Sequence, residues 1–326
     1  MTRFLPTLCK TAAAAFVLVA APAFAQKFPS ENITLVVPAA AGGSTDLLSR
    51  NLARAIQDQT GITVIVDNKA GAGGAIGVNA VARAKPDGYT LVVSVLDAIT
   101  VMPHLRKDMP YDVQKDLTHV ALIAETPWVF SVNPKVPAKS IEEFVKLASA
   151  KPGSMKFSSQ GVGTSGHLVV EMLKAHAKLD MLHVPYKGAG PATTAAIGGE
   201  VDMVATSPLT LRGFLAGGQL RGLGMTAAER SPMLPDIPTM KESGYPEFVI
   251  SAWFGVFAPA GLPEDRAKTL AKIIDDATKH PDMLKQFETA GLTARPLYGD
   301  DFRKYVENDS ANWKKVIEGI NLTIND

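Results

Sequence analysis

The chain has 326 residues, 33 of them basic and 32 acidic, for a formal net charge of +1. No basic stripe or run stands out, which argues against nucleic acid as a partner, because nucleic-acid interfaces concentrate lysine and arginine on one face. The only cysteine, Cys9, lies in the leader described next, so the remaining chain has no disulfide, thiolate metal site or cysteine nucleophile. About 300 further residues exceed what one hydrophobic core usually holds, so we expect two domains.

The first 25 residues have the features of a cleaved secretory signal peptide. Arg3 and Lys10 flank the start of an apolar run rich in alanine and valine, and Ala23-Phe24-Ala25 matches the small-x-small cleavage pattern. The run is too short to span a bilayer as a stable helix, and nothing after it is longer and as apolar. We expect export and a mature chain beginning at Gln26; an uncleaved anchor is the alternative.

Strand-like and helix-like segments then alternate, which favours an α/β architecture with parallel sheets. Ile33–Val37 is an apolar strand, and apolar residues at helical spacing predict a helix over 47–59 that begins near Ser44–Asp46. The next expected elements are a strand at 63–67, a helix from the glycine cluster 71–77 to about residue 84, and a strand at 90–95.

Two segments are predicted to cross between this first unit and a second one. Trp128–Val132 is a strand leading away, and Ala252–Ala258 is a strand returning. Two lobes joined by crossings near 126–134 and 249–259 form a hinged clamp, whose cleft is a favoured ligand site. Between the crossings we expect helices at 140–150, 167–177, 191–197 and 210–216 and strands at 155–158, 181–184, 201–205 and 220–225; the C-terminal helices are expected at 263–279, 282–290 and 299–319.

The segment from Ile33 to Asp46 delivers a loop of small residues to a helix N-terminus. Small residues let a ligand approach the backbone, and the first N–H groups of a helix lack intrahelical partners and carry partial positive charge. The loop therefore predicts a seat for a carboxylate or a phosphate. Asp46 itself is expected to bond nearby N–H groups and favour the helix dipole; the alternative is that it binds an amine or orders water.

Gly161-Val-Gly-Thr-Ser-Gly166 fits G-x-G-x-x-G between a strand and a helix. A dinucleotide site is disfavoured, because Asp180 precedes the next strand instead of following it, and an exported protein would need its cofactor supplied outside the cytoplasm. A second anion-binding loop using Thr164 and Ser165 is the preferred interpretation, with a purely structural turn as the alternative. We therefore expect no cofactor.

The glycine cluster 71–77 has no Walker lysine after it, so it is not a phosphate-binding P-loop. Close helix–strand packing and a cleft-facing role both remain open for it.

Catalysis is the rival interpretation, with Ser165 as nucleophile and His167 as base in an exported hydrolase. The G-x-S-x-G spacing is absent around Ser165, and the six histidines show neither H-E-x-x-H nor another metal-ligand spacing. We therefore expect no enzymatic activity and no metal. His167 and His183 are expected to be packing residues, and Trp253 with Phe254 to lie in the hinge core instead of stacking on a ligand.

Several motifs together resemble the receptors of tripartite tricarboxylate transporters, often called Bug proteins. They follow the family's order and cover nearly the whole mature chain. The blocks are Val36–Asp46, Asn68–Gly77, Pro86–Leu91, Gly161–Leu168, His183–Gly188, Gly198–Asp202, Arg230–Thr239, Glu242–Gly244 and Trp253–Gly261.

The resemblance implies a two-lobed periplasmic-binding-protein fold of type II, with two crossover strands at the hinge. The implied organisation is a signal peptide over 1–25, lobe 1 over 26–126 plus 253–326, and lobe 2 over 127–252. Such receptors are monomeric, non-enzymatic and periplasmic; they close over a small organic acid and deliver it to membrane permease subunits. A ligand-sensing subunit of a signalling system is the alternative that this sequence does not separate from transport.

The family's binding loops carry over onto two groups of residues, one on each lobe. In the family, one ligand carboxylate is held between the loop after the first strand and the glycine-rich loop of the second lobe. Carried over, the ligand-binding residues are Ala39, Ala40, Ala41, Gly42, Ser44, Asp46, Leu96 and Asp97 on lobe 1, and Gly163, Thr164, Ser165, His167, Thr206 and Ser207 on lobe 2.

This sequence departs from the family in two places. Ala39-Ala40-Ala41 stands where a bulky residue and a second proline are usual, which removes side-chain bulk and would enlarge the pocket. Leu96-Asp97-Ala98 stands where small hydroxyl residues are common. If Asp97 faces the cleft, it disfavours a second ligand carboxylate and favours a cationic group.

Overall fold

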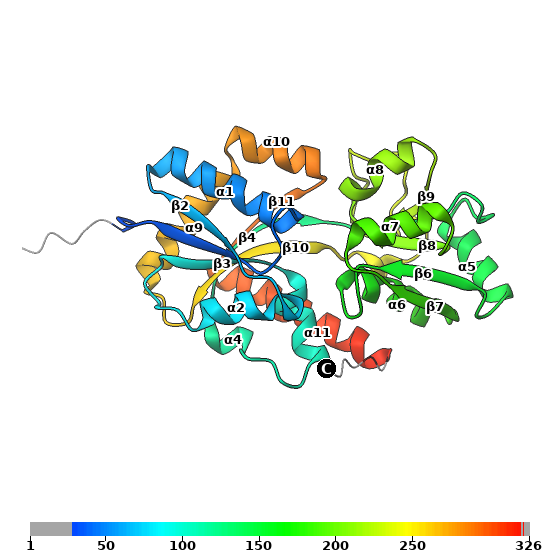
Figure 1. The fold of residues 1–326 in the computed structure, drawn as a ribbon, viewed down its shortest axis with the longest axis horizontal. Coiled ribbons are helices and arrows are strands. Elements are labelled where there is room, and N and C mark those ends of the chain that lie inside the picture. Colours follow the sequence, from blue (N-terminus) through cyan, green and yellow to red (C-terminus); the bar gives the residue numbers. More distant parts are fainter. Residues whose placement is uncertain (1–27, 321, 323–326) are drawn as a thin grey trace, which may run out of the picture.

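A computed structural model describes residues 28–320 and 322. The predicted signal peptide, its cleavage site and Cys9 lie outside the described residues. The chain forms two α/β lobes side by side, each built on one sheet, with two chain segments running between them (Figure 1). We call the lobe that contains the first strand lobe 1 and the other lobe 2.

Lobe 1 holds a six-stranded sheet in the order β11-β4-β10-β3-β1-β2. Its strands are β1 (Ile33–Val37), β2 (Val64–Asn68), β3 (Thr90–Val95), β4 (Leu117–Thr126), β10 (Ala252–Pro259) and β11 (Thr293–Tyr298). Its helices are α1 (Ser44–Thr60), α2 (Ala75–Ala82), α3 (Met102–Leu105), α4 (Val113–Asp116), α9 (Glu264–Thr278), α10 (Pro281–Ala290) and α11 (Gly299–Gly319), with short turns η1 (Ala72–Gly74) and η2 (Asp97–Val101).

Lobe 2 holds a five-stranded sheet in the order β7-β6-β8-β5-β9. Its strands are β5 (Val129–Val132), β6 (Met155–Ser159), β7 (Met181–Pro185), β8 (Met203–Thr206) and β9 (Arg221–Met225). Its helices are α5 (Ile141–Ala150), α6 (Ser165–Ala177), α7 (Ala189–Gly198) and α8 (Pro208–Ala216), and the short turn η3 (Pro246–Phe248) precedes the return to lobe 1.

The two segments that cross between the lobes enter their new sheets in the same way. β5 follows the first crossing and pairs antiparallel with both β8 and β9. β10 follows the second crossing and pairs antiparallel with both β3 and β4. Each sheet thus receives one reversed strand from the other lobe, which ties the lobes together at the hinge and confirms the expected two-lobed fold.

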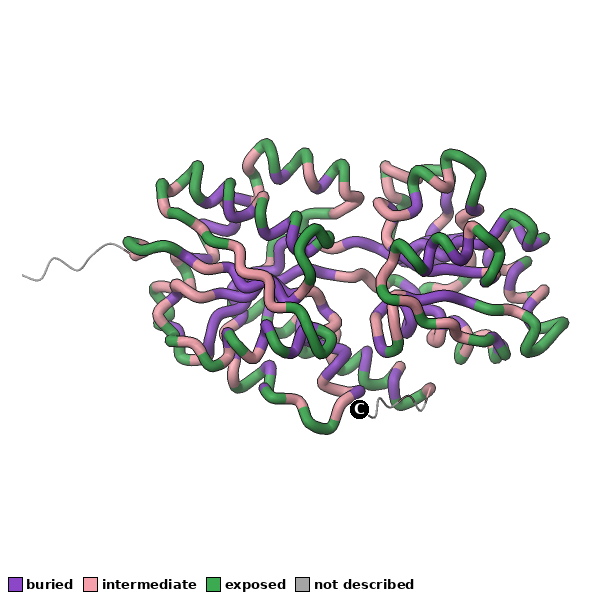
Figure 2. Tube along the Cα trace, in the orientation of Figure 1, coloured by how far each residue is buried: buried purple, intermediate pink, exposed green. Residues whose placement is uncertain are grey.

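Helices cover both faces of each sheet, so the central strands are among the most buried parts of the chain (Figure 2). On lobe 1, α1, α9 and α10 share a core with one face of β1 and β3, while α2 and α11 pack on the other face. The second of these cores continues into α5 and α6 of lobe 2. Trp128 and Trp313 meet edge to face at this junction, with ring centroids 6.1 Å apart.

The structure adds elements that the sequence patterns did not predict. β4 and β11 were not expected as strands, and residues 97–101 form a π-helical turn leading into α3. β4 is buried on both faces and has a continuous apolar run over Val120–Ala124, so it lacks the alternation that marks a half-buried strand. β11 is mostly exposed and contains Pro296, as an edge strand tolerates. No helix among residues 28–320 and 322 combines the length and apolar composition of a membrane span.

His119 on β4 is a buried titratable group inside the core of lobe 1. Its ring lies edge-on to Phe257 and Phe302, with centroids 5.2 and 5.7 Å away, and its Nε2 has no hydrogen-bond partner. Burial, with a smaller contribution from Arg303, lowers the pKa of His119 from 6.5 to about 4. Between these values the unfolded chain binds a proton that the native protein does not, so stability falls as the pH drops through that window.

We therefore expect His119→Leu to stabilise the protein, and more so in acid. Removing the unpaired Nε2 should raise the free energy of unfolding by about 1 kcal/mol at pH 7. Removing the titration should add about 2 kcal/mol to that gain at pH 5. Urea unfolding of both proteins at the two pH values measures this, and an equal gain at both would contradict the titration of His119.

Candidate functional site

Two pairs of parallel strands, one pair in each sheet, carry the predicted loops at their C-terminal ends, where the two lobes face each other. β1 and β3 are parallel neighbours, so the loops after Val37 and Val95 lie at the same edge of the first sheet. β6 and β8 are parallel neighbours in the second sheet, so the loops after Ser159 and Thr206 share an edge as well. The topology thus places the predicted ligand residues in two groups, one on each side of the gap between the lobes (Figure 1).

The lobe 1 loop, residues 38–43, ends at the uncapped N-terminus of α1. Gly43 is the N-cap residue and offers no side chain, so the first N–H groups of α1 have no side-chain acceptor. The surrounding residues Ala40, Ala41, Gly42 and Ser44 are exposed. Backbone N–H groups at the positive end of a 17-residue helix, with almost no side-chain bulk around them, suit an anion.

Asp46 holds this loop in shape. Its side chain is buried, and its oxygens accept the Gly42 N–H at 2.8 Å, Arg50 Nε at 3.0 Å and Asn68 Nδ2 at 3.0 Å. The Asn68 amide also donates to the Ala39 carbonyl at 3.1 Å. The Arg50 guanidinium holds the pKa of Asp46 below its usual value. The carboxylate is therefore engaged with the protein itself, as the structural interpretation of Asp46 predicted.

The glycine cluster 71–77 packs against the back of the same loop. A Cβ on Gly77 would lie 2.8 Å from the Pro38 Cα and 2.9 Å from the Lys69 carbonyl oxygen, and a Cβ on Gly74 would meet Ala98 at 3.0 Å. The Pro38 Cα and the Lys69 carbonyl oxygen belong to the backbone, so they cannot make room for a side chain without a shift of their segments. Two roles were left open for the cluster, close packing and facing the cleft. The contacts of Gly74 and Gly77 show the close-packing role.

On lobe 2, the loop at 161–165 is organised by Thr164 and His167. The Thr164 hydroxyl donates to the Gly161 carbonyl at 2.9 Å and accepts the His167 N–H at 3.4 Å, so Thr164 is the N-cap of α6. The Gly163 N–H donates to His167 Nδ1 at 3.2 Å. The His167 ring also stacks on His183 at 3.8 Å, within the protein interior. His167 and His183 are thus packing residues, as expected.

The contacts of His167 do not form a nucleophile–base pair with Ser165. Its Nδ1 accepts the Gly163 N–H, and its Nε2 faces Glu171 Oε1 at 3.6 Å. A hydrolytic serine needs a base nitrogen within hydrogen-bond reach of its hydroxyl. Both ring nitrogens of His167 are directed at other groups, so the geometry disfavours the hydrolase alternative.

The dinucleotide alternative also lacks its acidic partner. Asp180 precedes β7 and is exposed, whereas a ribose-binding acid belongs at the other end of that strand.

The third predicted loop follows β3. The Leu96 side chain is fully buried in the core, which leaves only its backbone for a ligand. Asp97 reaches across the gap between the lobes, and its Oδ1 accepts the backbone N–H of Ser165 at 3.2 Å. Burial raises the pKa of Asp97, and the Ser165 hydrogen bonds partly offset that rise.

The fourth predicted loop follows β8 and starts α8. Thr206 is buried at the end of β8, opposite Val129. Ser207 is the N-cap of α8, where its hydroxyl accepts the Thr210 N–H at 3.4 Å. Gln160 Nε2 donates to the Ala205 carbonyl at 3.1 Å, which joins this loop to the one after β6.

Comparison with known proteins agrees with this geometry. The sequence profile described as "Tripartite tricarboxylate transporter family receptor" matches residues 48–322. The chain is 36% identical to Protein BugT of Bordetella pertussis over 301 aligned residues. This alignment covers 92% of each of the two chains. This chain belongs to the tripartite tricarboxylate transporter receptor family.

Solved structures similar to this chain include the periplasmic binding protein BugD, with a TM-score of 0.78 at 29% identity over 91% of this chain and 99% of that one. MatC from Rhodopseudomonas palustris, solved with bound malate, has a TM-score of 0.78 at 30% identity over 89% of this chain and 100% of that one. The Rpa4515 protein of R. palustris, solved with adipate, has a TM-score of 0.81 at 28% identity over 91% of this chain and 99% of that one. The protein is therefore a solute-binding receptor of this family.

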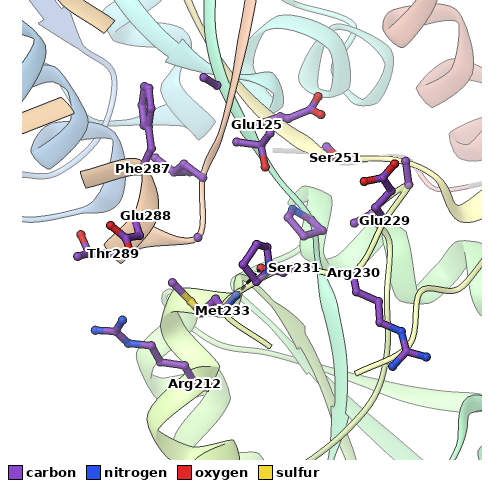
Figure 3. Close-up of a pocket in the computed structure, with 18 of the residues that line it drawn as sticks. Glu125, Arg212, Glu229, Arg230, Ser231, Met233, Ser251, Phe287, Glu288 and Thr289 are labelled. Carbon is purple, nitrogen blue, oxygen red and sulfur yellow. Dashed lines mark hydrogen bonds between the residues drawn. The ribbon is translucent and has the colours of Figure 1, made fainter. Parts of the chain in front are cut away.

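A hollow of the receptor lies at the hinge, on the side of the sheet where β4 and β11 meet. It measures about 990 Å³ and opens between α8, α10 and the two crossing segments (Figure 3). Its described lining includes Arg212, Ser231 and Glu288 but none of the predicted ligand residues. Since β1 and β3 lie beyond β10 in the sheet, this hollow and the predicted site are on opposite sides of the hinge.

The sequence patterns missed the residues that support the binding loops. Asn68 and Arg50 hold Asp46, and Gln160 ties two loops of lobe 2 together. Asn68 carried one usable signal, because it is a polar residue at the end of an apolar strand beside β1. The other two follow from packing that no local pattern encodes.

Proposed function

We propose that this receptor captures a small organic carboxylate in the periplasm, between its two lobes, and hands it to membrane permease subunits of a tripartite transporter. The observation that carries the proposal is the uncapped N-terminus of α1 at the facing edge of lobe 1. Its N–H groups are held in place by the Asp46 network and have no side-chain acceptor of their own. Charge-assisted hydrogen bonds from fixed N–H groups to a carboxylate are strong where water is excluded.

The adipate and malate named for two structural relatives support an acid as the ligand class. We propose that the loop residues Ala39–Gly42 and Ser44 hold the carboxylate on lobe 1. Across the gap, Thr164, Ser165 and Ser207 would line the lobe 2 side. Asp46 and His167 would act by positioning these loops.

Isothermal titration with mono-, di- and tricarboxylates, after a thermal-shift screen, tests the proposal, because a ligand that binds only the native state raises its stability. We expect at least one acid to bind tightly. Tight binding of a neutral solute, with no binding of any acid, would refute it.

We expect Ser44→Ala to weaken binding of that acid about tenfold without unfolding the protein, since a hydrogen bond to a charged group contributes roughly 1.5–3 kcal/mol. Thr164→Val should weaken binding as well, because the Thr164 hydroxyl donates to the Gly161 carbonyl and shapes the lobe 2 loop. Ser231→Ala is the matched control, because Ser231 lines the hollow on the other side of the hinge. If only the Ser231 variant lost affinity, the ligand would occupy that hollow, and the loops would be misassigned.

A further inference from the structure

A carboxylate of the protein already occupies part of the lobe 2 side of the proposed site. Asp97 belongs to lobe 1, and Ser165 is the first residue of α6 on lobe 2. The Asp97 Oδ1 accepts the Ser165 N–H at 3.2 Å across the gap between the lobes. An acidic side chain thus occupies the helix N-terminus where a second ligand carboxylate would otherwise bind.

Three further N–H groups around this loop are also engaged. The Gly163 N–H donates to His167 Nδ1, and the Thr164 N–H donates to the Gly161 carbonyl. The His167 N–H donates to the hydroxyl and the carbonyl oxygen of Thr164. The lobe 2 loop therefore has far less to offer an anion than the uncapped loop of lobe 1.

A second buried acid lies behind Asp97. Asp309 on α11 accepts the Thr100 hydroxyl at 2.6 Å and the Trp253 indole N–H at 2.9 Å. Burial raises the pKa of Asp309 to about 6, and the neighbouring Asp97 adds to that rise. The donors to these two acids are Ser165, Thr100 and Trp253, none of which is basic. Two acidic side chains thus lie close together at this pole of the site.

We propose that Asp97 is a specificity-determining residue that makes this receptor select monocarboxylates over dicarboxylates. The carboxylate binds at the α1 end of the site. The other end of the ligand meets Asp97, and it carries a neutral or cationic hydrogen-bond donor. A ligand carboxylate there would share a partly desolvated site with the Asp97 carboxyl, and two carboxyl groups so close together cannot both ionise at low cost. This inference rests on the proposed function and narrows its ligand class.

The test compares acids that differ only at the second end. Isothermal titration of the mature receptor with succinate, glutarate and adipate is set against their half-amides, succinamate, glutaramate and adipamate. We expect the wild type to bind the half-amide at least about tenfold more tightly in the pair that fits best. Asp97→Asn should bring that ratio to threefold or less, chiefly by strengthening dicarboxylate binding.

Asp58→Asn removes an acidic charge from the exposed face of α1 and is the control for overall charge; it should leave the ratio unchanged. Asp97→Ser serves as a second variant, and thermal melting checks that both Asp97 variants fold. A wild-type preference for the dicarboxylate, or a ratio that neither Asp97 variant changes, overturns the inference while the proposed function stands. Failure of every acid to bind the wild type and both variants overturns the proposed function and this inference with it.

Discussion

Asp46→Ala should abolish tight ligand binding and destabilise the receptor by about 3 kcal/mol, because it leaves several groups around one buried carboxylate without their partner. The Gly42 N–H, Arg50 Nε and Asn68 Nδ2 all donate to that carboxylate within 3.0 Å. Without it, the small-residue loop loses its hydrogen bond at Gly42 and keeps only weaker supports, such as the Asn68 amide on the Ala39 carbonyl. We expect affinity for the best acid to fall by at least about a hundredfold, since misplacing binding groups by about 1 Å has effects of that size.

Urea unfolding and isothermal titration measure the two effects. Asp46→Asn separates shape from charge, because the amide keeps one acceptor oxygen for the Gly42 N–H but weakens the pairing with Arg50. Its affinity should lie between those of the wild type and Asp46→Ala. The Asp58→Ala variant of the same helix is the control, and it should behave like the wild type. Wild-type affinity in Asp46→Ala would show that the loop does not bind the ligand.

Much of the fold follows from local pattern. The helices with a wide apolar stripe were predicted to within a few residues; for α5, both the Ser140 cap and the end at Ala150 agree. The crossings were predicted too. Residues 128–132 and 252–258 are apolar strands, and the strands and helices that alternate between them form a lobe of their own. These elements are specified by residues close together in the chain, and sequence reasoning can evaluate such residues directly.

The missed strands depend on tertiary context instead. β4 is a strand because β10 and β11 pair with it from distant parts of the chain. β11 is short of apolar residues and is held by that pairing at the edge of the sheet. Periodicity within a segment carries no information about such partners.

The same division runs through the proposed site. The loops could be predicted from sequence because small residues before a helix have a local physical meaning. Their supports were not found, because Asn68 lies 22 residues from Asp46 and Ser165 lies 68 residues from Asp97. Whether Asp97 faces lobe 2 was a question that only the arrangement of the lobes could answer. The proposed selectivity therefore depends on a contact between the lobes, which sequence patterns do not encode.

Trp253→Ala should be the most destabilising substitution that we predict, at about 4–5 kcal/mol. Trp253 comes directly after the second crossing, and its side chain is fully buried against Phe302 and Tyr305, with ring centroids 5.9 and 6.0 Å away. Its indole N–H donates to Asp309 at 2.9 Å. Truncation leaves a large cavity at the hinge and removes one of the donors to a buried acid. Urea unfolding measures the loss.

Trp253→Phe divides this loss into its two causes. Phenylalanine keeps most of the ring packing but has no N–H, so the cost should be about 1–3 kcal/mol, which is the price of one lost hydrogen bond to a buried acid. The Trp253→Phe, Asp309→Asn double variant should then cost less than the sum of its single variants, because both remove the same contact. Strict additivity would mean that the indole–carboxyl contact contributes nothing to stability. In that case side-chain packing alone would stabilise the hinge. The hydrogen bond from the Thr100 hydroxyl would be the stabilising contact of Asp309.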